Sequence, residues 1–515
     1  MKLHEAFLAM AAAASCAAAG ATEIGAERAA TRRMVDGEEY SMPIGELIEA
    51  GRQFFAASWT VQEGAGRPLT KGTGAPLGDP SRPLIFPFNF NRVSAPDANS
   101  CAGCHALPFA GGGGDIATNV FVLGQRFDFA SFDGNDLASL RGSANESGLP
   151  ATLQGIANSR GTIGMFGSGY IEMLARQMTA ELQHQRDILA PGRSRELEAS
   201  GVRFGRLARR VDGSYDVSGV RGLPAISLAG DIPNLIVRPF SQASAVVSLR
   251  EFTNNAMNHH HGIQSTERFG NGDPDGDGFV GEMSRAELTA TSIFQAVLQV
   301  PVRVIPRGRR VQQAVLLGEE RFVDVGCAGC HRPYLKLRDS RYSEPNPFNP
   351  PGNLRPEDVD APLVIDLNDR HLPGARLRAS RNGRTLVPAF TDLKLHTIYA
   401  DGDPNCELLN QTNGPLADGN CAFLTKKLWG LYSEPGFGHH GQYTTMREAI
   451  EAHAGEATPV MDAWWRLQDR ERDAIVEFLK TLRTAPDDVK ARFVDENFRP
   501  VHWRKFPYQA GKQND

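Results

Sequence analysis

The sequence of 515 residues lacks several features that would assign it directly to a class of protein. It has no apolar run long enough to cross a bilayer, so no membrane-spanning helix is expected. Its net charge of −5 is small for this length, so neither nucleic acid nor an anionic membrane is expected as a partner. No strand-rich, alternating region stands out, and the fold class is therefore expected to be mainly α. A chain this long exceeds one hydrophobic core, which indicates two or three domains.

The sequence has only seven cysteines, and three of them fit an exported protein, one in a signal peptide and two in a disulfide. Cys16 lies in an alanine-rich apolar segment that we expect to be a secretory signal peptide over residues 1–21, although a helix of the mature chain is the alternative. We therefore expect a periplasmic protein. A lipid anchor on Cys16 is less favoured, because Ala13 stands where lipoprotein signals usually have a larger aliphatic residue. Cys406 and Cys421 are expected to form a disulfide, with two free thiols as the alternative.

The other four cysteines form two Cys-x-x-Cys-His motifs, Cys101-Ala-Gly-Cys104-His105 and Cys327-Ala-Gly-Cys330-His331. Two thiols at this spacing can bond to the two vinyl groups of one haem, and the adjacent histidine is then held beneath the iron as its proximal ligand. A zinc ribbon would need two cysteine pairs close together, and these pairs are far apart in the chain. A thioredoxin-like site would need a βαβ context that is missing. The motifs predict two covalently bound haem c groups.

The sixth ligand decides whether a haem is closed or open to small molecules. His453 is the first candidate for the second haem. Thr445 and Glu448 have the spacing of a capping box, and Gly455 is expected to end the helix that they begin, which places His453 in its last turn. The alternative is a surface histidine stabilised by the end of the helix.

The run His259–His261 is a second histidine cluster, and neighbouring side chains in it point apart. We expect His260 to be the distal histidine of the first haem and its catalytic acid–base group, with a surface cluster as the alternative. We expect His396, His439 and His440 to lie beside haem propionates rather than on iron.

The acidic run that begins at Asp273 predicts a calcium loop. Asp273, Asp275 and Asp277 alternate before a glycine turn, and Glu282 follows, which matches the oxygen ligands that Ca²⁺ prefers. The twelfth position of an EF-hand would be Ser284 rather than Glu, so the loop is EF-like only. A plain acidic turn is the alternative.

The expected organisation is two c-type haem domains with long loops. They cover residues 40–300, including the calcium loop, and 311–485. Residues 300–310 are expected to be a linker, and residues 486–515 a tail.

A faint internal repeat supports two copies of one module, in which a helix precedes each haem motif. Gly51 and Phe54/Phe55 precede the first motif, and Gly318 and Phe322 precede the second. Helices are expected at 44–58, 170–190 and 311–323, and an amphipathic helix around Ile475–Leu482 is expected to close the second module. The run Gly111–Gly114 allows close approach of the backbone, either to the first haem or in a flexible loop.

Several runs together resemble the bacterial di-haem oxidoreductases, a thiol oxidoreductase-like family related to the di-haem cytochrome c peroxidases. These runs are Cys101-Ala-Gly-Cys-His-Ala-Leu-Pro-Phe-Ala-Gly-Gly-Gly-Gly, Asn258-His-His-His-Gly-Ile-Gln, Glu267-Arg-Phe-Gly, Asp273-Pro-Asp-Gly-Asp-Gly, Phe390-Thr-Asp-Leu-Lys-Leu-His396 and Leu428-Trp-Gly-Leu through Glu456. The resemblance implies a two-module α fold with a haem in each module and often calcium between them. In the peroxidases a His-Asp-Gly motif precedes the sixth ligand of the second haem. Here His440-Gly441 stands at that motif without the Asp, and His453 falls near the ligand position.

These features lead us to expect a di-haem oxidoreductase of the peroxidase type. One haem would meet a small-molecule oxidant or peroxide, and the other would relay electrons from a redox partner protein. The alternative is an electron-transfer cytochrome without a substrate of its own.

Overall fold

The structure is a computed structural model, and it describes residues 24–66, 98–121, 157–242, 244–273, 277–399, 403, 406, 421–439 and 441–504. The segment expected to be the signal peptide lies outside these residues. Within them, no helix is both long and apolar enough to cross a membrane. The helices are α1 (Ile44–Ala56), α2 (Cys101–Cys104), α4 (Ser168–Asp187), α5 (Ala225–Leu228), α6 (Leu249–Ala256), α7 (Thr266–Phe269), α8 (Arg285–Ala296), α9 (Arg309–Asp324), α10 (Met446–Glu451), α11 (Thr458–Arg466) and α12 (Asp469–Leu479).

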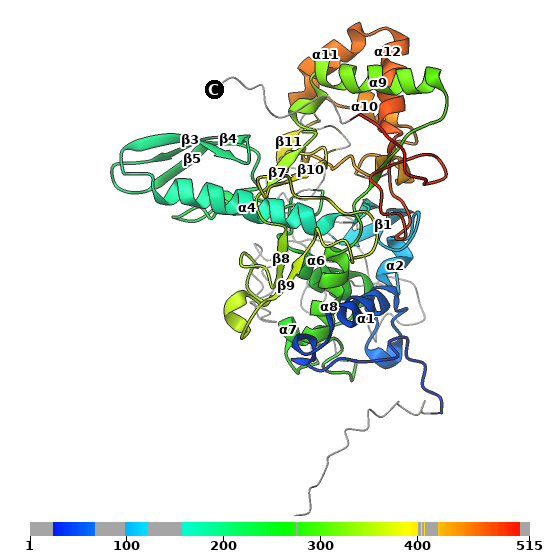
Figure 1. Cartoon of the computed structure of the whole chain (residues 1–515). Coiled ribbons are helices and arrows are strands. Elements are labelled where there is room, and N and C mark those ends of the chain that lie inside the picture. Colours follow the sequence, from blue (N-terminus) through cyan, green and yellow to red (C-terminus); the bar gives the residue numbers. More distant parts are fainter. Residues whose placement is uncertain are drawn as a thin grey trace, which may run out of the picture.

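In the part of the chain that the structure describes, short strands form six small sheets between these helices. Figure 1 shows α1, α6 and α8 at one end of the molecule, α9 to α12 at the other, and α4 between them. The strands are β1 (Gly114–Phe121), β2 (Ala157–Thr162), β3 (Arg193–Ala199), β4 (Val202–Arg209), β5 (Tyr215–Val220), β6 (Val302–Val304), β7 (Leu335–Leu337), β8 (Arg341–Glu344), β9 (Leu363–Asp366), β10 (Thr385–Val387), β11 (Leu395–Thr397), β12 (Ala422–Leu424), β13 (Leu482–Arg483) and β14 (Phe493–Val494).

The first module is built on the crossing of α1 and α8. Leu47, Phe54 and Phe55 are buried on the inner face of α1, as the sequence predicted. A Cβ atom on Gly51 would overlap the carbonyl oxygen of Ala290, so only glycine lets the two helix backbones come this close.

The second module repeats this construction with α9 and α12. A Cβ atom on Gly318 would overlap the carbonyl oxygen of Ala474, and the Phe322 and Phe478 rings pack edge to face with their centroids 5.3 Å apart. The helix before each haem motif thus crosses a later helix at a glycine. The predicted helices over 44–58 and 311–323 are confirmed within two residues at each end, and the repeat between them is visible in the structure.

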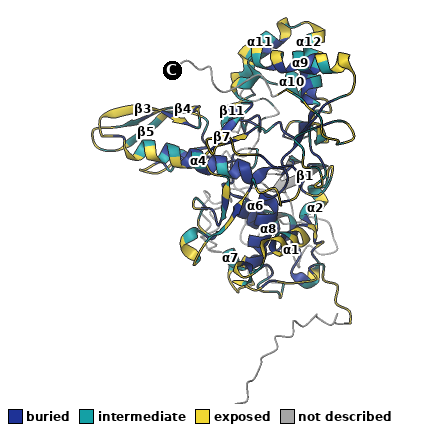
Figure 2. Cartoon of the chain, in the orientation of Figure 1, coloured by how far each residue is buried: buried dark blue, intermediate teal, exposed yellow. Residues whose placement is uncertain are grey.

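The helix α4 confirms the prediction over 170–190, but the sheet that it carries was not predicted. The antiparallel strands β3, β4 and β5 lie against α4 and place Leu197, Phe204 and Leu207 in the interior. Figure 2 shows a mixture of exposed, intermediate and buried residues on the strands of this sheet and a largely buried α4 beneath them. The expectation that no region is rich in strands was therefore wrong for residues 193–220.

Residues 300–310 do not form the expected linker. Their strand β6 is buried and lies between β13 and β14 in a three-stranded sheet. The segment Val302–Val304 pairs with Leu482–Arg483 on one side and Phe493–Val494 on the other. Part of the expected tail is thus paired in the same sheet.

Among the described residues, buried apolar side chains form three clusters, and the border between the two larger ones does not follow the expected division of the chain. The core around α1, α4 and α8 also takes in side chains between Leu335 and Leu393, as well as Trp429. The guanidinium of Arg250 is fully buried and pairs with Glu267 at 2.6 Å and with Glu344 at 3.0 Å, which fastens β8 onto α6. The second core combines side chains of α9, α11 and α12 with others that include Phe390, Leu428, Leu431 and Met446.

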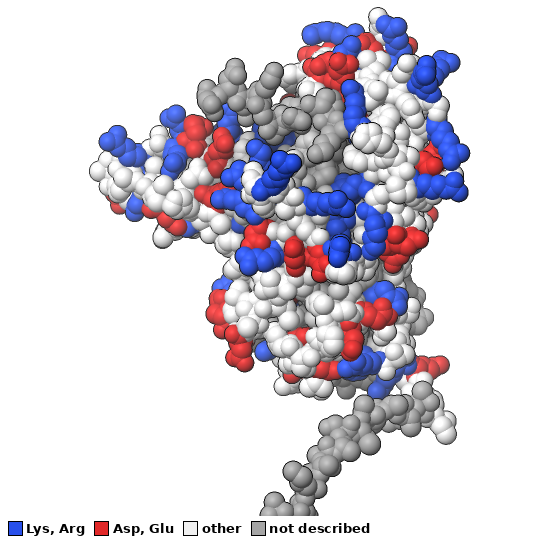
Figure 3. Space-filling model, viewed as in Figure 1, with Lys and Arg blue, Asp and Glu red and all other residues white. Residues whose placement is uncertain are grey.

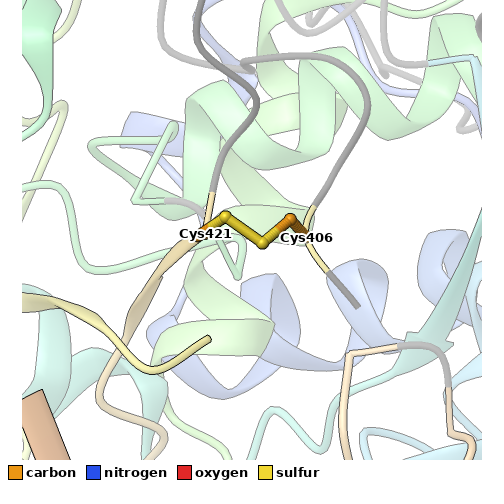
Figure 4. Close-up of a disulfide and its surroundings, with 2 residues drawn as sticks. All are labelled: Cys406 and Cys421. Carbon is orange, nitrogen blue, oxygen red and sulfur yellow. A yellow bond between two sulfur atoms is a disulfide. The ribbon is translucent and has the colours of Figure 1, made fainter. Parts of the chain in front are cut away.

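The predicted disulfide between Cys406 and Cys421 is confirmed (Figure 4). The Cα atoms of the two residues are 4.4 Å apart. Cys421 directly precedes β12, which pairs with β11, so the bond lies at one end of this strand pair. The four cysteines of the Cys-x-x-Cys-His motifs take no part in a disulfide.

Substituting alanine for Gly51 tests the helix crossing of the first module. We expect Gly51→Ala to lower the free energy of unfolding by about 1–3 kcal/mol, because its methyl group overlaps the backbone of α8. Gly45→Ala in the same helix is the matched control, since its Cβ atom meets no other atom within 4 Å. Thermal unfolding of both variants is the measurement, and equal melting temperatures would contradict the close crossing.

Candidate functional site

The first motif is held in one helical turn. Ser100 caps α2 by accepting a hydrogen bond from the Gly103 amide at 2.9 Å, and the His105 amide donates to the Cys101 carbonyl oxygen at 2.9 Å. The Nδ1 atom of His105 lies 3.1 Å from the Gly112 carbonyl oxygen. A proton on Nδ1 satisfies this contact and leaves Nε2 available as a metal ligand.

The glycine run after this motif packs against the protein itself. Side chains on Gly111–Gly114 would overlap, in order, Leu298, the carbonyl oxygen of Leu107, Glu434 and the carbonyl oxygen of Cys104. The run therefore closes a turn beneath the motif, and its close approach is to neighbouring protein atoms. These contacts do not fit a flexible loop, and contact of the run with the first haem stays a prediction.

The second motif has the same local construction. Residues Cys327–Gly329 form a 3₁₀ turn, and the His331 amide donates to the Cys327 carbonyl oxygen at 3.0 Å. The Nδ1 atom of His331 lies 3.2 Å from the Phe390 carbonyl oxygen. Burial lowers the pKa of both His105 and His331 to about 4, so both imidazoles are neutral, as metal ligation requires.

Both motifs open into one cavity of about 480 Å³. Its wall includes Cys101, Cys104 and His105 from the first motif and Cys327, Cys330 and His331 from the second. The two sites are therefore neighbours, although their motifs lie far apart in the sequence.

His453 reaches this cavity from the end of α10. The predicted capping box is present, because Thr445 Oγ1 accepts from the Glu448 amide and the Glu448 carboxylate accepts from the Thr445 amide. The helix ends at Glu451, before Gly455, so His453 lies two residues beyond it rather than in its last turn. The Nδ1 atom of His453 lies 2.8 Å from the Ala449 carbonyl oxygen, which again leaves Nε2 free for a metal.

The His331 and His453 rings lie close together at the second site, with their planes inclined at 63°. Their centroids are 6.5 Å apart. Two imidazoles on opposite sides of one metal ion, with metal–nitrogen bonds of about 2 Å and each centroid roughly 1 Å beyond its nitrogen, have centroids about 6 Å apart. The spacing of this pair thus fits an iron between them.

The histidine cluster lines the other part of the cavity, on a π-helical turn over Met257–His261. His261 has its Nδ1 atom 2.6 Å from the Ala98 carbonyl oxygen and its Nε2 atom 3.7 Å from Cys101 Sγ. His260 also lines the cavity, and its charge contributes to lowering the pKa of His105. The side chain of His259 lies outside the described residues. His260 therefore shares the cavity with His105, and its role as the distal histidine of the first haem stays a prediction.

His396 is held between two carboxylates and is not placed as an iron ligand. Its Nδ1 atom lies 2.8 Å from Glu456 Oε2, and its Nε2 atom lies 2.9 Å from Asp392 Oδ2. Burial opposes protonation, but hydrogen bonding to Asp392 outweighs it and raises the pKa of His396 to about 11. Potential ligand atoms of Cys330, Asp392 and His396 lie within 4.8 Å of one another, which places this charged group beside the second motif.

His439 belongs to an aromatic group on the cavity wall. Its ring lies 4.4 Å from the Phe423 ring and 6.2 Å from the Tyr399 ring. Its carbonyl oxygen accepts from the Gly161 amide at 2.9 Å, which joins this segment to β2. His440 lies outside the described residues.

The predicted calcium ligands are described only in part. Asp275 lies outside the described residues. The Asp273 carboxylate accepts from the amides of Asp277 and Gly278 at 3.0 and 2.9 Å, while the Glu282 carboxylate accepts from the Gln264 amide at 2.7 Å. Among the described residues, the acidic groups of this loop do not gather into a three-ligand cluster. Calcium binding by this loop stays a prediction.

The motif thiols fit covalent attachment to haem better than a thiolate metal centre. Burial raises the pKa of Cys101 and of Cys327 to about 12. Each site offers two thiols and one adjacent histidine on the cavity wall, which is the set of groups that attaches a haem c. The anchored histidines and the shared cavity also fit haem at both motifs.

Two groups near the sites were not predicted from the sequence. Lys427 lines the cavity and donates to the Gly164 carbonyl oxygen, and Glu434 accepts from the Gly164 amide at 3.1 Å. Nothing in the sequence around Lys427 distinguishes it from a surface lysine. Asp392 stands four residues before His396, and this spacing was the only signal that the two could interact.

Comparisons with known proteins leave the family of this chain open. No family model matches the sequence, and no curated protein is significantly similar to it. Among solved structures, the chain is similar to the hydrazine synthase of Kuenenia stuttgartiensis, with 15% sequence identity and a TM-score of 0.30. The match covers 80% of this chain and 98% of that one. A likeness at this TM-score carries no argument about function.

Replacing His453 tests its pairing with His331. We expect His453→Ala to convert one low-spin haem signal to high-spin, because the second iron would lose an imidazole. Added imidazole should restore the low-spin signal. The measurement is the optical and electron paramagnetic resonance spectrum, with His371→Ala at an exposed position as the control. A His453→Ala protein that keeps the wild-type low-spin spectrum would contradict the pairing.

Proposed function

We propose that the chain is a di-haem c-type oxidoreductase of the peroxidase type. The observation that carries the proposal is the close pair of His331 and His453 in a cavity that also contains the first Cys-x-x-Cys-His motif. A pair of imidazoles closes the second site and suits it to electron transfer. The first site then has the reactive role.

The residues of the chain have distinct parts in this proposal. Haem iron supplies one-electron chemistry and, where a coordination position is open, a place for peroxide to bind. His105 and His331 hold the two groups from the proximal side, and His453 closes the second. His260 serves as the acid–base group of the first site, since an imidazole beside the iron can move a peroxide proton near neutral pH.

The proposed setting is the periplasm, with a redox partner protein as the electron donor or acceptor. Covalent haem attachment, the disulfide between Cys406 and Cys421 and the apolar N-terminal segment all fit an exported protein. A calcium ion bound by Asp273 and its acidic neighbours is part of the same proposal.

Haem content is the first test of the proposed function. We expect the mature protein to exceed the mass of its chain by two haems, and denatured protein to keep haem-dependent peroxidase stain on a gel. Cys327→Ser should lose the second haem and keep the first, whereas Cys406→Ser, which breaks only the disulfide, should keep both. A wild-type chain that carries no haem would refute the proposal.

Peroxide turnover tests the role of His260. We expect His260→Ala to slow turnover about a hundredfold at unchanged haem content, because general acid–base catalysis typically contributes this much or more. His184→Ala, at an exposed position on α4, is the control. A loss of turnover in His261→Ala but not in His260→Ala would reassign the role. A half-reduced wild type that does not react with peroxide would favour an electron-transfer cytochrome.

A further inference from the structure

The two haem sites differ in the charge placed behind their proximal histidines. At the first site, the Lys427 ammonium donates to the Gly164 carbonyl oxygen. Gly164 lies against Gly113, and the neighbouring Gly112 carbonyl holds Nδ1 of His105. Lys427 thus lies on the side of His105 that is anchored to the protein.

The charge around Lys427 is positive in sum. Lys426 and Glu434 are its charged neighbours, and Lys426 Nζ lies 3.9 Å from Glu434 Oε2. Two cations and one anion leave one positive charge. Burial lowers the pKa of Lys427 to about 8, which still leaves the amine protonated at neutral pH.

The charge behind His331 is negative in sum. Asp392 follows two residues after Phe390, whose carbonyl holds Nδ1 of His331. The protonated His396 lies between Asp392 and Glu456, so two anions and one cation leave one negative charge. This group lies within 4.8 Å of Cys330 Sγ, a predicted attachment atom of the second haem.

The surface charges on one face of the molecule are of mixed sign. On the face shown in Figure 3, Lys and Arg are interspersed with Asp and Glu over both ends of the molecule. Exposed charges are screened by salt, whereas charges on a cavity wall act at short range in a medium of lower dielectric constant. The buried charges around Lys427 and Asp392 therefore act more strongly on the two sites than exposed charges at a similar distance.

We propose that Lys427 and Asp392 set the order of reduction, so that the haem at His105 accepts an electron at a higher potential than the haem at His331. The inference rests on the proposed function, and it adds the direction in which an electron moves between the two haems. Reduction removes one positive charge from a haem iron. A nearby cation favours the reduced form, and a nearby anion favours the oxidised form.

The proposed ligands of the second site do not oppose this order. Methionine opposite histidine raises the potential of a cytochrome haem, and the His331–His453 pair gives the second site no such ligand. An electron shared between the sites is then held at the first one, where His260 lies. With this order, electron transfer from the haem at His331 to the haem at His105 is favourable.

A redox titration followed by electron paramagnetic resonance tests the order directly. The low-spin signal that His453→Ala abolishes identifies the second haem, and we expect it to be reduced at lower potential than the first. At the midpoint potential of the first haem in the wild type, Lys427→Gln should lower the ferrous-to-ferric ratio of this haem about tenfold. This is the effect of one charge roughly 10 Å away at an effective dielectric constant of about 20. Asp392→Asn should raise the same ratio for the second haem.

Lys490→Gln is the matched control, because Lys490 also donates to a backbone carbonyl, that of Leu372, but is not among the residues that line the cavity. Lys427→Arg keeps the charge and should keep the wild-type midpoint even if the Gln variant folds poorly. Reduction of the second, low-spin haem at a higher potential than the first would overturn the inference. An unchanged midpoint potential of the first haem in Lys427→Gln, or a lowered one in Lys427→Arg, would also overturn it. A chain with two haems in the reverse order would refute this inference alone, whereas a chain without haem would refute the proposed function as well.

Discussion

One hydrogen bond from Nδ1 to a backbone carbonyl orients each of the three histidines that are proposed to bind iron. His105, His331 and His453 all make this contact. Such a bond contributes only about 1 kcal/mol to folding, but it selects the tautomer and fixes the plane of the ring. The three acceptor carbonyls belong to a glycine turn, a loop before β11 and a short capped helix. Haem binding therefore requires that all three local structures form and pack together.

The packing is achieved by segments that run along the border of the two cores. Phe390 belongs to the second core and Leu393 to the first, while Leu428 belongs to the second and Trp429 to the first. A segment shared in this way cannot shift in one core without disturbing the other. The two sites are thus placed relative to each other by continuous backbone as well as by contact between modules. The helix crossings at Gly51 and Gly318 are the part of the architecture that the two modules share.

Sequence reasoning found the features that depend on local order and missed those that depend on distant partners. The helices α1, α4 and α9 follow from apolar periodicity, and the haem motifs and the disulfide follow from cysteine spacing. The strand β6 was missed because Val302–Val304 is short and flanked by prolines, and only pairing with two distant segments makes it a strand. Lys427 was missed because its role arises from the backbone of Gly164, far away in the chain.

Ligation and charge are linked in this arrangement because the same short segments supply both. Asp392 is two residues from Phe390, whose carbonyl holds His331, and Glu456 is three residues from His453. The contact of His396 with both carboxylates therefore ties the loop behind one ligand to the turn that carries the other. A buried carboxylate is costly unless it is paired, and the imidazolium of His396 offsets that cost while leaving a net negative charge. The packing that positions the second pair of ligands consequently also fixes the electrostatic environment of that site.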